Sequence, residues 1–118
     1  MFVSYDQMEA KFDIVFLEEA RSFRGSINEK AQRKILYNMD KARFLNDISL
    51  LKKLTPEIWE FRTLYQGLQY RLLAFWDVKQ KPTLVVATHG FVKKTGKVAR
   101  EEIKKANSLR QLYIEQYT

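Results

Sequence analysis

Near its start the chain carries a short alternating pattern of apolar residues. Phe12, Ile14 and Phe16 occupy every second position, which is typical of a strand with one buried face. Residues 17–24 then have helical spacing, and Gly25 is a suitable place for that helix to end. The pattern therefore predicts a strand followed directly by a short helix.

A longer helix is predicted next. Ser26 and Glu29 have the spacing of a capping box, in which the serine hydroxyl accepts a hydrogen bond from the Glu29 amide. Apolar residues then recur every three or four positions, with basic side chains on the opposite side of the helix. This stripe consists of Ile27, Ala31, Ile35, Met39, Ala42 and Leu45. We expect the helix to pack on a sheet and to end before Thr55-Pro56.

The second half of the chain changes to residues that favour strands. Residues 58–64 and 68–76 are rich in aromatic and branched side chains. Gln66-Gly67 lies between the two runs and is suited to a tight turn. The two runs therefore predict a hairpin.

A third strand and a last helix complete the predicted order. Residues 83–89 form an apolar run whose centre is apolar on both faces, as in a strand covered on each side. A loop around Gly90 and Gly96 leads to helical spacing over residues 98–113. The order strand, two helices, three strands and one helix predicts an α+β domain with a mainly antiparallel sheet.

The composition excludes several classes of protein. The chain has 118 residues, 46% of them hydrophobic, which is enough for one domain with a buried core. Without cysteine and with a single histidine, it lacks disulfides, thiolate metal sites and histidine-rich metal cages, and no metal or other cofactor is predicted. No apolar run could span a bilayer and no secretion signal is visible, so we expect a cytoplasmic protein with no membrane partner. Residues 11–118 are predicted to form the domain and residues 1–10 an N-terminal extension.

The net charge of +7 is concentrated in the second half of the chain. Residues 1–59 hold ten basic and nine acidic side chains, whereas residues 60–118 hold eleven and five. Within residues 61–97 there are seven basic side chains and a single acid, Asp77. Such a concentration indicates a surface for a polyanion or an acidic partner, although a solvated basic face has the same composition.

Two arginines are predicted to face each other across the hairpin. With the turn centred on Gln66-Gly67, Arg62 and Arg71 are direct cross-strand partners. Like charges in that arrangement destabilise a sheet by roughly 0.2–1 kcal/mol, unless an anion lies between them. The pair is therefore a candidate site at which two guanidinium groups hold one phosphate. In the alternative interpretation, one arginine pairs with Glu60 or Asp77 and the other extends into solvent.

Further candidate side chains lie at and beyond the end of the third strand. If this strand pairs antiparallel with residues 68–76 of the hairpin, its end places His89 near Arg71. The face of the sheet that His89 occupies is left open. The residues that follow are Phe91, Lys93, Lys94 and Lys97. This set suits metal-free RNA cleavage, which needs proton transfer, cations for the phosphorane and a ring on which a base can stack. Each residue alone also has a purely structural interpretation.

Two segments resemble a known family of proteins. Residues 58–71 read IWEFRTLYQGLQYR, and residues 87–95 read ATHGFVKKT. A strand with E-(L/F)-R, a hairpin to Y-R, and H-G-F-x-K-K-T before the last helix resembles the phage-derived Gp49-like/HigB branch of the RelE/ParE superfamily of toxins. The resemblance covers residues 11–115.

The resemblance implies a toxin of a type II toxin–antitoxin pair that cleaves mRNA on the ribosome. Its partner would be an antitoxin with an acidic segment, often of the helix-turn-helix type. By motif position, the implied RNA-handling site consists of Arg62, Arg71, His89, Phe91, Lys93 and Lys94. The arginines would hold the scissile phosphate, the two lysines would supply backbone contacts or a proton, and the histidine would be an acid or base.

The chain departs from the family pattern after Lys94. Gly96 stands where relatives commonly have glutamine, and Val98 lies where they often have proline, which affects how Lys97 is positioned. Two other functions stay open: a ParE-like gyrase poison without nuclease activity, and a non-enzymatic nucleic-acid-binding module. For the nuclease, we expect Arg71→Ala to abolish toxicity and leave the domain folded, because Arg71 is predicted on an exposed strand.

Overall fold

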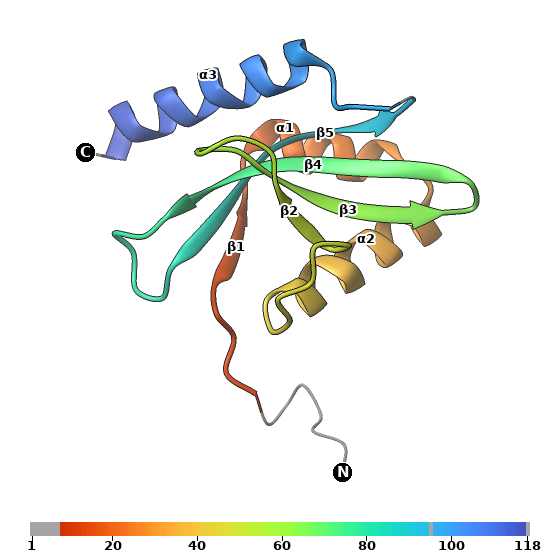
Figure 1. Cartoon of the computed structure of the whole chain (residues 1–118), viewed down its shortest axis with the longest axis horizontal. Coiled ribbons are helices and arrows are strands. Elements are labelled where there is room, and N and C mark those ends of the chain that lie inside the picture. The colour runs from red at the N-terminus through yellow and green to blue at the C-terminus, as the bar shows by residue number, and fades with distance from the viewer. Residues whose placement is uncertain (1–7, 95, 118) are drawn as a thin grey trace.

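Over residues 8–94 and 96–117, the computed structural model contains a five-stranded sheet and three helices (Figure 1). In chain order these are β1 (Asp13–Phe16), α1 (Glu18–Ser26), α2 (Glu29–Ala42), β2 (Leu51–Lys53), β3 (Trp59–Tyr65), β4 (Leu68–Asp77), β5 (Leu84–Lys93) and α3 (Arg100–Tyr117). The strand order is β1-β5-β4-β3-β2, with β1 parallel to β5 and all other neighbours antiparallel. The predicted α+β class with a mainly antiparallel sheet is confirmed.

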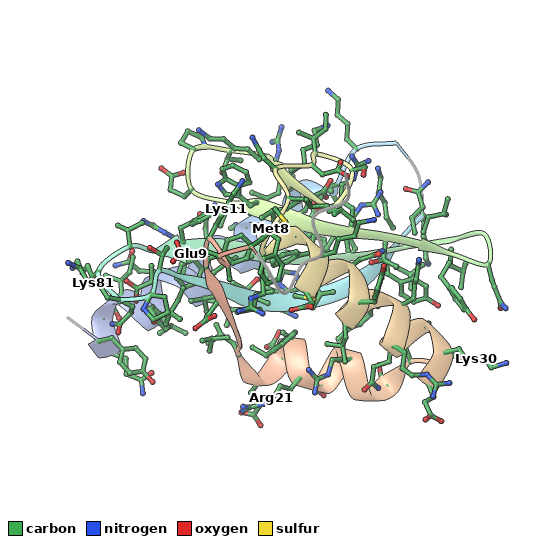
Figure 2. The ribbon with its side chains drawn as sticks, turned by 90° about the horizontal axis from the view of Figure 1, so that it is seen from below. Met8, Glu9, Lys11, Arg21, Lys30 and Lys81 are labelled. Carbon is green, nitrogen blue, oxygen red and sulfur yellow. The ribbon has the colours of Figure 1, made fainter. Side chains whose placement is uncertain are left out.

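Helices cover the sheet on both faces. The first face carries α1 and α2 over the larger apolar cluster, which includes Ala20, Ile35, Phe61 and Leu72. The other face carries α3 over a smaller cluster around Leu73, Phe75, Val86 and Ala106. Polar side chains of the first two helices, such as Arg21 and Lys30, point away from the sheet (Figure 2). The centre of β5 is buried from both sides, as its apolar sequence predicts.

The junction between the first two helices differs from the predicted capping box. α1 continues through Gly25 to Ser26, and the Ser26 hydroxyl donates to a carbonyl inside that helix. Asn28 caps α2 instead, because its side-chain oxygen accepts hydrogen bonds from the amides of Lys30 and Ala31. The prediction of a helix start here is confirmed, but the predicted capping residues are wrong.

α2 ends before Thr55, as predicted, but it stops at Ala42, short of Leu45 in the predicted apolar stripe, and an unpredicted strand follows it. Asp47 accepts hydrogen bonds from the amide and hydroxyl of Ser49 (2.9 and 2.7 Å), which forms a turn that a helix cannot contain. These bonds also lower the pKa of Asp47. The turn leads into β2, which pairs antiparallel with β3. The predicted order of elements therefore lacked one short strand.

The hairpin between β3 and β4 has the predicted turn and register. Gln66 and Gly67 both have positive φ (48° and 78°), as a two-residue turn of type I′ requires. Every pair of the ladder follows from that turn, including Arg62 opposite Arg71. The prediction that these two arginines are cross-strand partners is confirmed.

β5 is longer than predicted and contains an irregularity. It runs to Lys93, so the predicted loop at Gly90 is wrong and Phe91 lies inside the strand. Leu73 pairs with His89, whereas the next residue of β4 pairs with Ala87, so Thr88 is an extra residue in β5. This bulge turns His89 toward α3 and thereby settles the face that the sequence left open.

The N-terminal part of the chain joins the domain at Lys11, whose amide donates to the carbonyl of Arg43 (2.8 Å). Residues 1–7 of the predicted extension lie outside the described residues. In the part of the chain that the structure describes, no helix is long and apolar enough to cross a membrane.

Gly90 allows α1 to approach β5 closely, and we expect Gly90→Ala to destabilise the fold. A Cβ at this position would lie 2.2 Å from the ring of Phe23, and such overpacking costs about 1–3 kcal/mol. Gly25→Ala is the matched control, because a Cβ there meets no atom within 4 Å and should stabilise α1 slightly. Urea unfolding of both variants measures the difference. A Gly90→Ala variant as stable as the parent protein would contradict the close packing of Phe23.

Candidate functional site

Side chains of three adjacent strands form a regular array on the face of the sheet that carries α3. Directly paired residues of neighbouring strands point to the same face, so the registers define three rows. In the order β3, β4, β5 these rows are Glu60–Leu73–His89, Arg62–Arg71–Phe91 and Leu64–Gln69–Lys93. We call these nine residues the site array. Four of the six residues that the family resemblance implies as an RNA site, Arg62, Arg71, His89 and Phe91, lie in its first two rows.

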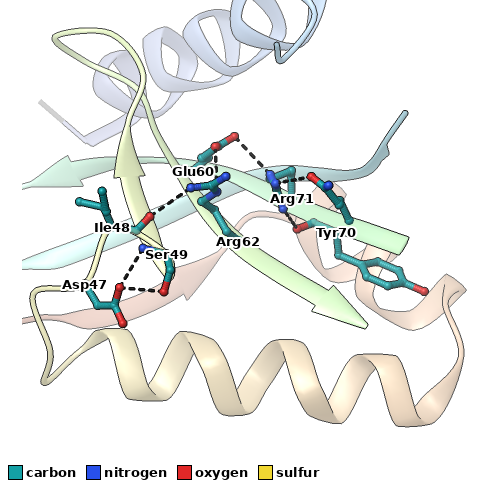
Figure 3. Close-up of polar contacts among 8 residues, drawn as sticks. Asp47, Ile48, Ser49, Glu60, Arg62, Tyr70 and Arg71 are labelled. Carbon is teal, nitrogen blue, oxygen red and sulfur yellow. Dashed lines mark hydrogen bonds and ion pairs between the residues drawn. The ribbon is translucent and has the colours of Figure 1, made fainter. Parts of the chain in front are cut away.

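A carboxylate lies between the two arginines. Glu60 precedes Arg62 by two residues on β3 and is diagonal to Arg71 on β4. Its Oε1 lies 3.4 Å from Nε of Arg62, and its Oε2 lies 3.6 Å from Nε of Arg71 (Figure 3). Glu60 therefore offsets the repulsion between both arginines, whereas the alternative interpretation gave it only one of them.

Arg71 is buried, which corrects the expectation that it lies on an exposed strand. Only 3% of the residue is accessible, and its guanidinium donates to the Tyr70 carbonyl (3.0 Å) and the Gln69 side chain (2.7 Å). Burial lowers the pKa of Arg71, Glu60 opposes this, and the nearby Arg62 adds to the lowering. Removing one partner of a buried ion pair typically costs about 3–5 kcal/mol. Loss of toxicity in Arg71→Ala would therefore not separate a functional role from loss of the fold.

Arg62 is the accessible arginine of the pair. Its side chain is 29% exposed, and one terminal nitrogen donates to the Ile48 carbonyl at 3.3 Å. That carbonyl belongs to the turn between α2 and β2, which the hydrogen bonds between Asp47 and Ser49 order (Figure 3). Of the two guanidinium groups, the Arg62 group is thus the one that an external anion reaches first.

His89 connects the sheet to α3 rather than facing solvent. The residue is 3% exposed, its Nε2 lies 3.1 Å from Oε1 of Glu102, and its Nδ1 lies 3.0 Å from the Thr88 hydroxyl. The Thr88 hydroxyl also lies 3.2 Å from the Leu73 carbonyl and has a single proton. With a neutral ring, Nε2–H donates to Glu102, and the Thr88 hydroxyl donates either to Nδ1 or to that carbonyl. Both ring nitrogens therefore have a polar neighbour within the protein, and the role of His89 as an acid or base stays a prediction.

The lysines lie together at the end of β5. Lys93, Lys94 and Lys97 line a hollow of about 250 Å³ together with Phe91 and Glu102, beside the start of α3. Phe91 also packs on the smaller apolar cluster under this helix. Because Phe91 pairs directly with Arg71, the hollow adjoins the arginines. The arrangement brings an aromatic ring, three ammonium groups and the guanidinium of Arg62 into one surface region, with the buried guanidinium of Arg71 beneath it.

Three residues of this region were not predicted as part of a site. Lys52 of β2 pairs with Glu60 and is exposed, so it extends the first row of the site array beyond β3. It was missed because β2 was missed. Gln69 could have been found, since the predicted hairpin register places it on the same face as Arg71. Glu102 lies thirteen residues from His89 on another element, and no local pattern relates the two.

The described residues offer no obvious place for a metal. Over residues 8–94 and 96–117, no group of three or more His, Cys, Asp or Glu side chains could hold a metal ion. The chemistry that the region can supply is cationic: it can bind an anion and stabilise negative charge that develops on it.

Comparison with known proteins adds one finding. A family model described as Phage derived protein Gp49-like (DUF891) matches residues 24–111, which is more than half of the chain. The match includes the whole site array and the hollow beside α3. Among curated proteins, no sequence matches this chain.

We expect His89 to make the fold sensitive to acid. Burial lowers its pKa from 6.5, and of the neighbouring charges Glu102 and Glu19 oppose this while Lys105 adds to it. The unfolded chain therefore takes up a proton before the folded protein does, and stability falls as the pH drops below about 6.5. The loss cannot exceed about 1.4 kcal/mol per pH unit for one group.

Urea unfolding between pH 7.5 and 5 tests this expectation. His89→Gln should be less stable than the parent protein at pH 7.5, and the difference should shrink as the pH falls. Parallel pH profiles for the two proteins would show that the buried imidazole does not resist protonation.

Proposed function

Because the chain belongs to the family of phage-derived Gp49-like proteins, which is toxin-like, we propose that it is the toxin of a type II toxin–antitoxin pair and cleaves mRNA as a metal-independent endoribonuclease. The family supports the toxin at a coarse level. The nuclease activity is the further step, and it rests on the side chains of the site array.

The observation that carries the nuclease proposal is the row Arg62–Arg71–Phe91 with the lysines beside it. An RNA strand offers a phosphate for the guanidinium of Arg62 and an unstacked base for the ring of Phe91. Lys93, Lys94 and Lys97, which line the adjoining hollow, would contact neighbouring phosphates. A polyanion with bases is the ligand that uses all of these groups at once.

In the proposed reaction, a 2′-hydroxyl attacks the adjacent phosphorus atom, and the bond from phosphorus to the 5′-oxygen breaks. One proton leaves the 2′-hydroxyl and another reaches the departing 5′-oxygen, which gives a 2′,3′-cyclic phosphate and a free 5′-hydroxyl. Arg62 contacts the phosphorane and stabilises its negative charge, and the buried guanidinium of Arg71 adds positive charge from within the sheet. Because both nitrogens of His89 have a polar neighbour within the protein, we assign the proton transfers to Lys93 and Lys94 and a positioning role to His89.

Two partners follow from the proposal. The net charge of +7 and the basic region favour a partner antitoxin with an acidic segment, which would cover the site array and neutralise it. Ribosome-bound mRNA is the proposed substrate, because the same basic surface suits the surrounding ribosomal RNA.

We expect Arg62→Ala to reduce mRNA cleavage by roughly 100-fold, because it removes the accessible charge that stabilises the phosphorane. The protein should stay folded, since Arg62 is partly exposed and its two contacts are long. Arg21→Ala is the control: it removes the same charge from an exposed position on α1, on the other face of the sheet. Induced expression followed by growth curves and mapping of mRNA 5′ ends measures both.

The same experiment separates the other functions. Intact RNA with a rising DNA-damage response would favour a gyrase poison over the nuclease. Growth and RNA that both stay unchanged would contradict the toxin itself and leave a non-enzymatic nucleic-acid-binding module.

We expect Lys52 to contribute to RNA binding and its neighbour Lys53 to contribute less. Both side chains are exposed on β2, but Lys52 is paired with Glu60 on the face of the site array and Lys53 points to the opposite face. Lys52→Ala should weaken binding of an uncleavable 2′-deoxy oligonucleotide and reduce the slope of log affinity against log salt by about 1. Equal effects of Lys52→Ala and Lys53→Ala would show that the binding does not distinguish the two faces.

A further inference from the structure

In the described structure, the position between the two guanidinium groups is already occupied. The Glu60 carboxylate, which is 3% exposed, points one oxygen at Nε of Arg62 and the other at Nε of Arg71 (Figure 3). A phosphate that enters this place brings a second anion to the same cations. The affinity for phosphate therefore depends on what happens to the contacts of Glu60.

The contacts of Glu60 are weak for charged groups. Hydrogen bonds between a cationic nitrogen and a carboxylate are usually about 2.7–2.9 Å long, whereas the N–O distances of the two Glu60 ion pairs are 3.4 and 3.6 Å. Oε2 of Glu60 and Nε of Arg71 are buried, and neither makes a hydrogen bond. A phosphate oxygen that approached Arg62 at normal hydrogen-bond distance would compete well with such contacts.

The two arginine side chains are held by different contacts, so they should not move equally when a phosphate binds. Arg71 is fixed by two good hydrogen bonds, to the Tyr70 carbonyl (3.0 Å) and to Gln69 (2.7 Å). Among the described residues, the Arg62 side chain makes a long contact to Glu60 and a 3.3 Å bond to the Ile48 carbonyl, and it is 29% exposed. Arg62 is thus free to turn toward solvent while Arg71 stays in place and keeps Glu60.

We propose that the Glu60 carboxylate competes with the substrate phosphate for Arg62. When the phosphate binds, Arg62 turns away from Glu60 toward the phosphate, and Glu60 stays paired with Arg71. The assignment of phosphate as the ligand rests on the proposed function, but the competition concerns anion binding alone. Glu60 therefore sets how tightly the site holds a phosphate, and it keeps the arginine pair from repelling when no ligand is present.

Titration with inorganic phosphate at constant ionic strength tests the competition without any cleavage. Glu60→Gln should bind phosphate roughly tenfold more tightly than Glu57→Gln, because only the first substitution removes the competing carboxylate. Glu57 is exposed three residues earlier, so its substitution makes the same change of net charge outside the arginine pair. Affinity of Glu60→Gln equal to or below that of Glu57→Gln would overturn the proposal.

The parent protein supplies a second measurement that does not depend on the folding of Glu60→Gln. NMR signals of the two guanidinium Nε–H groups report on the contacts to Glu60. Phosphate should shift the Arg62 signal more than the Arg71 signal, and signals that stay unmoved or move equally throughout the titration would overturn the proposal. A protein that binds phosphate in this way but leaves mRNA intact would contradict the nuclease and not the competition.

Discussion

The register of the β3–β4 hairpin is the constraint on which the candidate site depends. The turn at Gln66-Gly67 requires positive φ at both residues, and this geometry fixes every pair of the ladder. It sets Arg62 against Arg71, an arrangement that costs free energy unless an anion is near. Glu60 is the anion that the chain itself provides, since alternate residues of a strand share a face. A slip of one residue would place Glu60 and Arg62 on the opposite face of the sheet from Arg71.

β5 completes the region through two local departures from regular pairing. The extra residue Thr88 reverses the side-chain alternation, so His89 points at α3 and Phe91 points alongside Arg71. Gly90 then lets the ring of Phe23 pack directly against the strand from the other face. Together these features hold β5 between α1 and α3, and its end therefore presents the lysines at a defined place beside the arginines.

The parts of the fold that sequence predicted are those governed by local rules. The hairpin register followed from two turn residues, and the α2 stripe followed from helical spacing. β2 was missed because three residues carry too little pattern and Leu45 continued the apolar spacing past the end of the helix. The bulge at Thr88 has no local signal, because an extra residue in a strand is visible only against its partner. Burial of Arg71 was missed because it depends on how the side chains of Glu60 and Gln69 pack around the guanidinium, which the register alone does not specify.

Stability alone does not explain the buried charges of Glu60 and Arg71, because apolar residues of similar volume often give a protein that is equally or more stable. In β3 and β4 the positions of Glu60 and Arg71 could be filled by residues such as their neighbours Phe61 and Leu72, which pack without any polar partner. The chain instead keeps a carboxylate whose contacts to two guanidinium groups are long, and two atoms of this cluster make no hydrogen bond. Such a cluster stabilises the sheet poorly but is easily rearranged by a stronger anion. That balance suits a site whose ligand is a phosphate, because the protein folds with its own carboxylate in place and can release one arginine when the ligand arrives.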